Sequence, residues 1–380
     1  MIAPWKNLLQ QYGAIFDQKS ADLVVDFGHN HSEEAKLCQR GNAIISLPYT
    51  LIEVTGNDAK KFLQGQLSCN LETITTDSSL GAYCNIKGRI SALFRICQVQ
   101  ALEPSQITYL LRLPSSMATA TVTELKKYGA FSKVSIRALT DDLVVLGLVG
   151  AKVINAVQIE LKCVADHVRA TNHPSSASDN LTTRDYNICL QIPGDINHAE
   201  LYIEHQQALA LWPKLTKIAT PCSANAWELL EIMAGIPEIY PETKDAILPH
   251  YINLPALNAV SFTKGCYRGQ EIIARMQYRG KIKRHLYTAK LQGTTQSIGD
   301  SIYIPQAAIL DSALFDSGID ETMLDPAQMQ SVGTIIRLAA DTDNSTIALL
   351  ELSDTATNAK LVTNDGCSVS LNRANQGTTI

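Results

Sequence analysis

The residues whose types and spacing offer the most chemistry lie in the stretch FTKGCYRGQEIIARMQYRGKIKRHLY, residues 262–287. Gly265 and Gly269 bracket its most polar part, and glycine lets the backbone turn tightly or come close to a ligand. Gln270 and Glu271 then open an amphipathic run whose spacing predicts a helix. The segment is therefore either a loop shaped to hold a ligand or an ordered loop that simply precedes a helix.

Cys266 is the candidate nucleophile of this segment. It stands between Lys264 and Arg268, and positive neighbours lower the pKa of a thiol, so that more of the reactive thiolate is present. We expect a reactive thiol that acts as a transient nucleophile or redox group. The alternative is a small buried side chain.

Several common kinds of site are missing from the sequence. The nine cysteines include no CxxC pair and their number is odd, which argues against a zinc ribbon and against a disulfide framework. No Walker loop, GxGxxG, GxSxG or HExxH pattern occurs, so no nucleotide, hydrolase or metal site is predicted. The net charge of −5 gives no overall attraction to nucleic acid, so an RNA contact would need a local basic patch.

The sequence predicts a reducing, cytoplasmic environment. The first twenty residues contain no apolar stretch of signal-peptide length, and no run of eighteen apolar residues occurs. Unpaired cysteine spacings in a chain of this length fit the same compartment.

The rest of the chain must supply the elements that position this segment. A chain of 380 residues is too long for one compact core, so two or three domains are expected. After a peripheral segment at 1–44, residues 45–145 predict a strand, a helix capped by Asn57, a hairpin joined by Ile-Lys-Gly, a further strand and a helix capped by a serine. Residues 146–283 predict a second set of strands and helices. The two successive sets suggest an internal structural duplication, and strands grouped in hairpins favour an α+β fold over a doubly wound sheet.

The C-terminal part, residues 284–380, has a different texture. Short strand-like runs alternate with Gly, Asp and Asn turns and show almost no helical periodicity, which predicts a small antiparallel β-barrel. The acidic, turn-rich insertion at 311–330 is expected to be a surface loop.

At KGCYRGQEIIAR the chain resembles the YgfZ family, a branch of the superfamily that includes the glycine-cleavage aminomethyltransferase. We take residues 262–275 as the signature segment. Further stretches fit the family pattern in order along the chain: TGNDAKKFLQGQLSCNL, YCNIKGRISALFR, ELKKYGAFSKVSI, WELLEIMAGIPEIY, ILPHYINLPALNAVSFTKGC and VGTIIRLA. The resemblance implies an aminomethyltransferase-like folate-binding fold, made of two related α+β units and the C-terminal barrel.

The resemblance also implies a ligand and its contacts. Tetrahydrofolate or a related folate is expected in a central pocket, with ring contacts from Tyr49 and Trp227, since a pterin ring favours an aromatic face. Tyr49 stands where the family often has tryptophan, so its stacking surface is smaller. The signature turn is expected to complete the binding site through Lys264, Gly265, Tyr267, Arg268, Gly269, Gln270 and Glu271.

The function that the resemblance implies is a folate-binding accessory protein for iron–sulfur cluster assembly or repair and tRNA modification. Its partners would be iron–sulfur client or assembly proteins, with an indirect link to tRNA-modifying enzymes and no membrane. Cys266 alone cannot hold a cluster, which usually takes about four thiolates, so any cluster contact would be shared with a partner.

A folate-dependent one-carbon transferase acting on a small amine is the alternative function. Aminomethyltransferases of the superfamily carry an acidic pair after a turn that corresponds to Asn85–Gly88 here, yet residues 85–94 contain no Asp or Glu. Neutral side chains cannot replace a carboxylate as a base. The aminomethyl-transfer activity is therefore expected to be lost.

The basic residues that follow the signature segment allow two interpretations. A basic run follows the signature segment, made of Arg279, Lys281, Lys283, Arg284 and His285. It is either a solvated connector to the barrel or a patch for an anion, such as the glutamate tail of a folate or an RNA phosphate.

Overall fold

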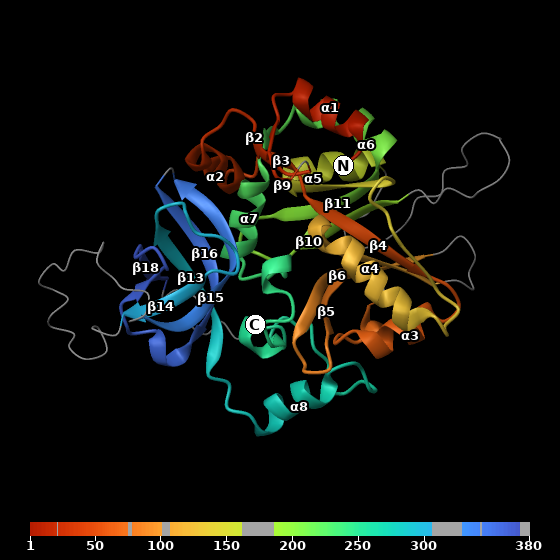
Figure 1. The fold of residues 1–380 in the computed structure, drawn as a ribbon. Coiled ribbons are helices and arrows are strands. Elements are labelled where there is room, and N and C mark those ends of the chain that lie inside the picture. The colour runs from red at the N-terminus through yellow and green to blue at the C-terminus, as the bar shows by residue number, and fades with distance from the viewer. Residues whose placement is uncertain are drawn as a thin grey trace, which may run out of the picture.

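The computed structural model describes residues 1–20, 22–74, 78–100, 107–161, 186–305, 329–342 and 344–372. Two five-stranded sheets and a closed barrel surround the centre of the molecule, as Figure 1 shows. The mixed helix and strand content and the antiparallel barrel confirm the predicted α+β fold class. The domain boundaries expected at 44/45, 145/146 and 283/284 stay predictions.

The first sheet has the strand order β5-β6-β7-β4-β8. Its strands are β4 (Tyr49–Thr55), β5 (Ser78–Cys84), β6 (Ile90–Gln100), β7 (Ile107–Pro114) and β8 (Ser135–Ala138). Its helices are α3 (Ala59–Gln66), α4 (Ser115–Gly129) and the short η1 (Leu71–Thr73). The predicted hairpin is confirmed, because β5 and β6 pair antiparallel. Figure 1 shows α3 and α4 on one side of this sheet.

The two helix caps predicted for this unit are wrong. Asp58, not Asn57, precedes α3, and its carboxylate accepts a hydrogen bond from the backbone nitrogen of Lys133 instead of capping the helix. Ser115 is the first residue of α4 and its hydroxyl meets that of Thr50 at 2.9 Å. In both helices the side chain at the observed start makes a tertiary contact instead of capping the helix.

The second sheet has the order β10-β11-β9-β3-β12. Its strands are β3 (Ala43–Ser46), β9 (Leu143–Val149), β10 (Asn187–Ile192), β11 (His198–Glu204) and β12 (Thr220–Cys222). Its helices are α5 (Ala151–Leu161), α6 (His205–Leu215) and α7 (Ala224–Met233). In this sheet β3 comes from the N-terminal segment and pairs with β9 and, in parallel, with β12. The chain then runs directly from β3 into β4 of the other sheet.

The N-terminal segment covers one face of the second sheet. It contains α1 (Ala3–Gln11), β1 (Ile15–Phe16), β2 (Val24–Asp26) and α2 (His31–Gln39). Trp5 of α1 meets Trp212 of α6 edge-on at 5.4 Å, and its indole nitrogen donates to Ser46. Both tryptophans belong to a hydrophobic cluster of their own, so this segment is packed into a core.

The barrel closes in the order β13-β16-β15-β14-β17-β18. Its elements are β13 (Arg284–Gln292), β14 (Ser301–Pro305), β15 (Met329–Thr342), β16 (Ser345–Ser353), η7 (Asp354–Ala356), β17 (Leu361–Val362) and β18 (Ser368–Leu371). A separate apolar cluster fills its interior. The expected acidic surface loop at 311–330 falls almost wholly outside the described residues.

Residues 234–283 connect the second sheet to the barrel. They include η2 (Pro241–Thr243), η3 (Pro249–Ile252) and α8 (Gln270–Arg279). The helix predicted after Gly269 is confirmed as α8, which lies at the bottom of Figure 1, below the turn between β5 and β6. Within the described part of the chain, no helix combines the length and the apolar character that crossing a bilayer requires.

Candidate ligand site and signature turn

Arg337 of β15 links the barrel to both sheets. Its Nε lies 2.8 Å from Glu228 and its Nη1 3.2 Å from Glu231, two carboxylates of α7. Nη1 also donates to the carbonyl oxygen of Ile236, and Nη2 donates to the hydroxyl of Tyr49 on β4, both at 3.1 Å. Arg337 is fully buried. Burying a guanidinium is costly unless its donors are paired, and this cluster supplies those partners from three parts of the fold.

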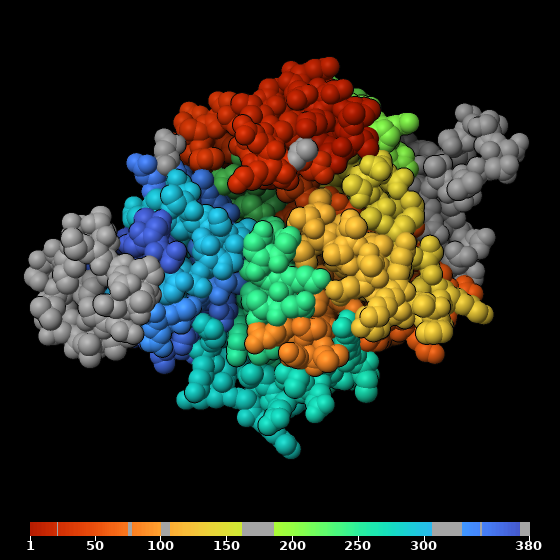
Figure 2. Space-filling model, in the orientation of Figure 1, coloured from red at the N-terminus to blue at the C-terminus, as the bar shows by residue number. Residues whose placement is uncertain are grey.

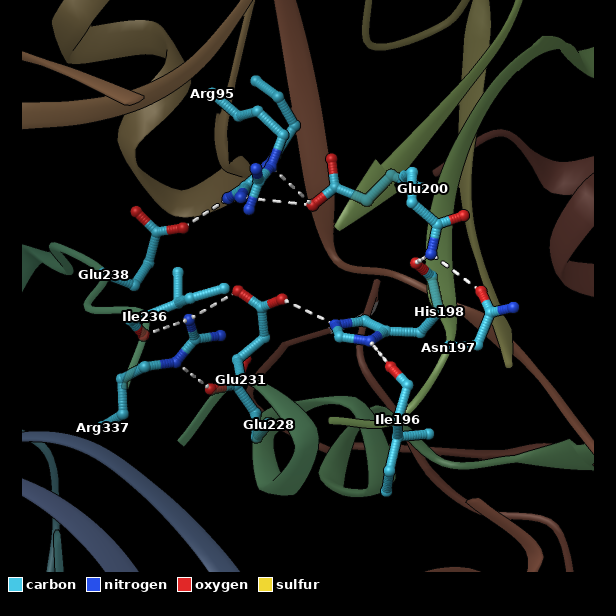
Figure 3. A network of polar contacts seen from close by, with 12 residues as sticks. Arg95, Ile196, Asn197, His198, Glu200, Glu228, Glu231, Ile236, Glu238 and Arg337 are labelled. Atoms are coloured by element: carbon cyan, nitrogen blue, oxygen red, sulfur yellow. Dashed lines mark hydrogen bonds and ion pairs between the residues drawn. The ribbon is translucent and has the colours of Figure 1, made fainter. Parts of the chain in front are cut away.

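A second group of charges continues this network within the two sheets, as Figure 3 shows in part. Glu200 of β11 lies 3.2 Å from Arg112 of β7 and 3.4 Å from Arg95 of β6. Arg112 also pairs with Glu238, and Tyr202 donates to Glu200 at 2.6 Å. We call both groups together the central network: Arg95, Arg112, Arg337, Glu200, Glu228, Glu231 and Glu238.

Two carboxyl groups of the central network, Glu231 and Glu238, have opposite pKa shifts. Burial alone would raise the pKa of Glu231, but His198, whose Nε2 lies 3.6 Å away, and the charge of Arg337 lower it to about 2. Burial raises the pKa of Glu238, and the charge of Arg112 opposes this shift without reversing it. Glu231 is therefore held as a carboxylate, whereas Glu238 takes up a proton more readily than Glu231 does.

Tyr49 lies at the edge of the central network. The guanidinium carbon of Arg112 is 4.1 Å from the centre of its ring, while its hydroxyl accepts from Arg337. Tyr49 is only 6% exposed. Together with Thr50 and Val145 it lines a cleft of about 40 Å³, which the N-terminal segment borders through Met1 and Trp5 and which has room for a few atoms only.

Trp227 of α7 lies in the same region and is fully buried. A Cβ atom on Gly147 would come within 2.5 Å of its ring, so the glycine lets β9 pack directly against the indole. The ring of His198 meets the indole edge-on, with 5.2 Å between the two ring centres. The indole nitrogen has no hydrogen-bond partner among the described residues. A buried donor without an acceptor is uncommon and suits a ligand atom.

The signature turn, residues 264–269, lies against the first sheet. Cys266 is exposed. Lys264 donates to the carbonyl oxygens of Leu67 and Cys69 at 2.8 and 2.7 Å, and burial lowers the pKa of its amine to about 8. The amine of Lys264 is thus directed to these backbone oxygens.

Arg268 and Tyr267 pack inward from the turn. The guanidinium of Arg268 donates to the hydroxyl of Tyr83 and lies 5.0 Å from that ring and 4.6 Å from the ring of Tyr128. Tyr267 is buried and its hydroxyl has no hydrogen-bond partner among the described residues. The turn is therefore held by its two cations and one aromatic ring, while the thiol of Cys266 faces outward.

The two glycines of the turn have different surroundings. Gly269 precedes α8 with φ +79°, and a Cβ atom there would lie 2.5 Å from the carbonyl oxygen of Asn85. Gly265 has no such neighbour within 4 Å. Gln270 begins α8, and Glu271 is exposed in its first turn.

A carboxylate that sequence reasoning missed lies beside the turn at Asn85–Gly88. Asp245 accepts a hydrogen bond from the side-chain amide of Asn85 at 2.9 Å and another from the hydroxyl of Ser91 at 2.5 Å. Asp245 has φ +58°, a conformation that few non-glycine residues adopt. The stretch 85–94 has no acid of its own, but the chain supplies one from residue 245. Its distance along the sequence gave no signal of this.

The structure thus brings Tyr49 and Trp227 to one buried region, and the expected part of the signature turn in the ligand site stays a prediction. In the described part of the chain, the hydrogen bonds and ion pairs of the turn go to the first sheet and its connections, and none is shared with the central network. Sequence reasoning did not find the charges of the central network. Their only local sign was charged residues within otherwise apolar strands, such as Arg95, Arg112 and Glu200.

No model of a known protein family matches the chain. Among curated proteins, the tRNA-modifying protein YgfZ of Colwellia psychrerythraea is 33% identical over 243 residues, which are 63% of this chain and 69% of that protein. The protein of the same name from Yersinia pseudotuberculosis is 33% identical over 246 residues, 64% of this chain and 69% of that protein. An uncharacterized protein of Haemophilus influenzae is 30% identical over 67% of this chain and 75% of its own length.

Among solved structures, the fold is similar to that of glycine cleavage system aminomethyltransferase T from Bartonella henselae. The TM-score is 0.65 at 15% identity, with 97% of this chain and 95% of the other covered. This likeness confirms the predicted aminomethyltransferase-like fold. On the identity and coverage of the curated relatives, the chain belongs to the YgfZ family.

Proposed function

We propose that the protein binds a folate at the central network and acts in tRNA modification as an accessory factor. Membership of a family whose curated proteins are called tRNA-modifying carries this proposal. The aminomethyltransferase fold supports a folate as the ligand. A cytoplasmic location and iron–sulfur client proteins belong to the same proposal.

The residues of the central network fit such a ligand. Trp227 Nε1, Arg95 Nη2 and Arg112 Nε are buried donors without hydrogen-bond partners in the described part of the chain. Pterin rings carry carbonyl and ring-nitrogen acceptors that would satisfy such donors, and Glu228 is the partly exposed carboxylate that could accept from an amino group. Because Tyr49 and Trp227 are buried, ring contacts with a ligand require the side chains around these two residues to move.

In this proposal, Cys266 is an exposed thiol that contacts a partner protein. Its position on the surface allows contact with a large partner such as an iron–sulfur protein. Lys264 and Arg268 are engaged with the first sheet, so they position the turn that presents the thiol.

Calorimetric titration with tetrahydrofolate tests the ligand. Trp227→Phe keeps most of the buried volume but removes the indole nitrogen and part of the ring, and should weaken binding roughly three- to tenfold. The matched control is Trp212→Phe, an equally buried tryptophan of the other core, which should leave the affinity unchanged. Absence of binding by the wild type, or equal losses in both variants, would reject the proposed site.

One observation favours the alternative, a one-carbon transferase. Asp245 brings a carboxylate to the turn at Asn85 where the acidic pair of aminomethyltransferases is missing. A methylamine-dependent assay with tetrahydrofolate separates the two functions. Turnover that is lost in Asp245→Asn would favour the transferase, and no turnover supports the accessory role.

A further inference from the structure

Four cations on and after α8 have no ion-pair partner within the described part of the chain. Arg275, Arg279, Lys281 and Lys283 are all exposed, and none of them has an ion pair or side-chain hydrogen bond among the described residues. The residues from 262 to 285 contain seven Lys and Arg and one acid, Glu271, although the whole chain has a net charge of −5. Positive charge is therefore concentrated on one segment of an acidic protein.

The structure divides the basic run that the sequence showed. Arg284 lies 2.8 Å from Glu351 and donates to the carbonyl oxygen of Val332, and His285 lies 2.6 Å from Asp354. These two residues belong to the barrel and their charges have partners. The cations just before them remain open to an external anion.

An exposed aromatic ring lies among these cations. Tyr278 is 70% exposed, although its ring is supported edge-on by Phe262 at 6.0 Å. Residues three and four apart share a helix face, so Tyr278 and Arg279 lie on the same side of α8 as Arg275. A supported, exposed ring flanked by cations is the arrangement on which unpaired bases stack.

We propose that these five residues form a surface that binds a single-stranded part of an RNA, with Tyr278 stacking on a base and the four cations contacting phosphates. We call it the α8 surface: Arg275, Tyr278, Arg279, Lys281 and Lys283. This deepens the proposed function, since it makes the contact with RNA direct.

The extent of the α8 surface favours RNA over the glutamate tail of a folate. Arg279 lies four helical steps after Arg275, about 6 Å along the axis, and the connector to Lys283 adds at most about 13 Å. A strand of RNA offers a phosphate at every nucleotide along such a length, whereas a folate tail ends in a few carboxylates. In Figure 2 the teal segment that contains α8 stands out from the bottom of the molecule, where a large ligand can reach it.

The α8 surface has neighbours that bear on its charge. The turn at Asn85–Gly88 lies against α8, since a Cβ atom on Gly88 would be only 3.0 Å from Ile272. Lys87 is exposed on this turn and adds to the positive charge. Glu271 is the one acid on α8, and it lies a full turn before Arg275, at the end away from the connector. The positive potential is therefore strongest toward residues 279–283.

Binding of a labelled, unmodified tRNA transcript and of a short single-stranded RNA tests the proposal with the full-length chain. Replacing Arg275, Arg279, Lys281 and Lys283 together by Gln should weaken binding at low salt at least tenfold. It should also lower the slope of log affinity against log salt by about 3, since each phosphate contact contributes about 0.7 for a single strand. Tyr278→Ala should weaken binding about tenfold with the slope unchanged.

The matched control replaces four exposed lysines elsewhere by Gln: Lys126, Lys133, Lys152 and Lys217. It changes the net charge by the same amount and should leave RNA affinity within about twofold. Equal losses in the two quadruple variants would overturn the inference, as would a wild type that binds neither RNA.

Tetrahydrofolate titration of the same variants separates this inference from the proposed function. Unchanged folate affinity in the α8 quadruple variant supports an RNA surface. Loss of folate affinity with RNA affinity unchanged would assign the cations to the folate tail and overturn it. If no variant, nor the wild type, binds folate while RNA binding follows α8, the proposed folate function fails and the α8 surface stands.

Discussion

Cys266 differs from the other described cysteines in its exposure. Cys38, Cys69, Cys84, Cys97, Cys189 and Cys222 are buried, and Cys367 is intermediate. Alkylating reagents must reach the sulfur and react with the thiolate, and burial raises the pKa of thiols such as Cys69 and Cys84 to about 12. We therefore expect Cys266 to be alkylated first among these cysteines near neutral pH, as measured by mass spectrometry of peptides over time.

The same exposure separates a functional from a structural role. Cys266→Ala should leave the melting temperature unchanged, because it removes no buried atoms. A clear fall in melting temperature, or slower alkylation of Cys266 than of Cys367, would contradict the placement of this thiol.

At the level of single residues, the sequence predicted the candidate site only in part. Tyr49 and Trp227 were found by family resemblance, and the structure places both beside the central network. Arg337 and Glu231 could not be found in this way, because a buried charge is recognised by its partner and the partner lies about a hundred residues away. Asp245 is exposed, and it was missed because its partner Asn85 lies 160 residues away in the sequence.

Gly269 and Gly265 provide a test at the level of the element. Gly269→Ala would force a Cβ atom onto the carbonyl oxygen of Asn85 at a positive φ, so it should lower stability by about 1–3 kcal/mol and loosen the start of α8. Gly265→Ala is the matched control, since it meets no atom within 4 Å, and should change stability by less than about 0.5 kcal/mol. Thermal unfolding of both variants measures the difference, and similar values would contradict the close approach.

The elements themselves were more predictable than their ends. Periodicity identified α3, α4, α5 and α8 and the main barrel strands, because each hides one apolar face. The cap of α3 was wrong because the helix begins one residue later than Asn57 would set it, and the cap of α4 was wrong because Ser115 makes a tertiary contact. The two- and three-residue strands β17 and β12 are too short to have a period and exist through their pairing.

For the whole molecule, Arg337 is the residue that joins the barrel to both sheets. Arg337→Met should lower the free energy of unfolding by about 3–5 kcal/mol, because it leaves the buried Glu231 and its neighbour Glu228 without their cation. The control is Lys290→Met, which breaks a partly exposed pair with Asp341 on the same barrel and should cost at most about 1 kcal/mol. Urea unfolding measures both losses. Equal losses would show that the central network does not hold the three parts together.

The overall arrangement of two sheets and a barrel followed from family resemblance and from the change of texture near residue 284. The position of β3 in the second sheet could not be predicted, because a strand-like run does not reveal which distant strand it pairs with. Strand order depends on contacts between residues far apart in the chain, which local patterns do not record.

The position of β3 has a consequence for how the chain folds during synthesis. β4 to β8 are consecutive, so the first sheet has all its strands once residue 138 has left the ribosome. β3 is made before any of them, yet its partners are β9, which ends at residue 149, and β12, which ends at residue 222. The earliest strand of the second sheet is therefore tethered to an already complete neighbour through Leu47 and Pro48, gains its first partner once residue 149 has been made, and has one edge unpaired until residue 222 has been translated.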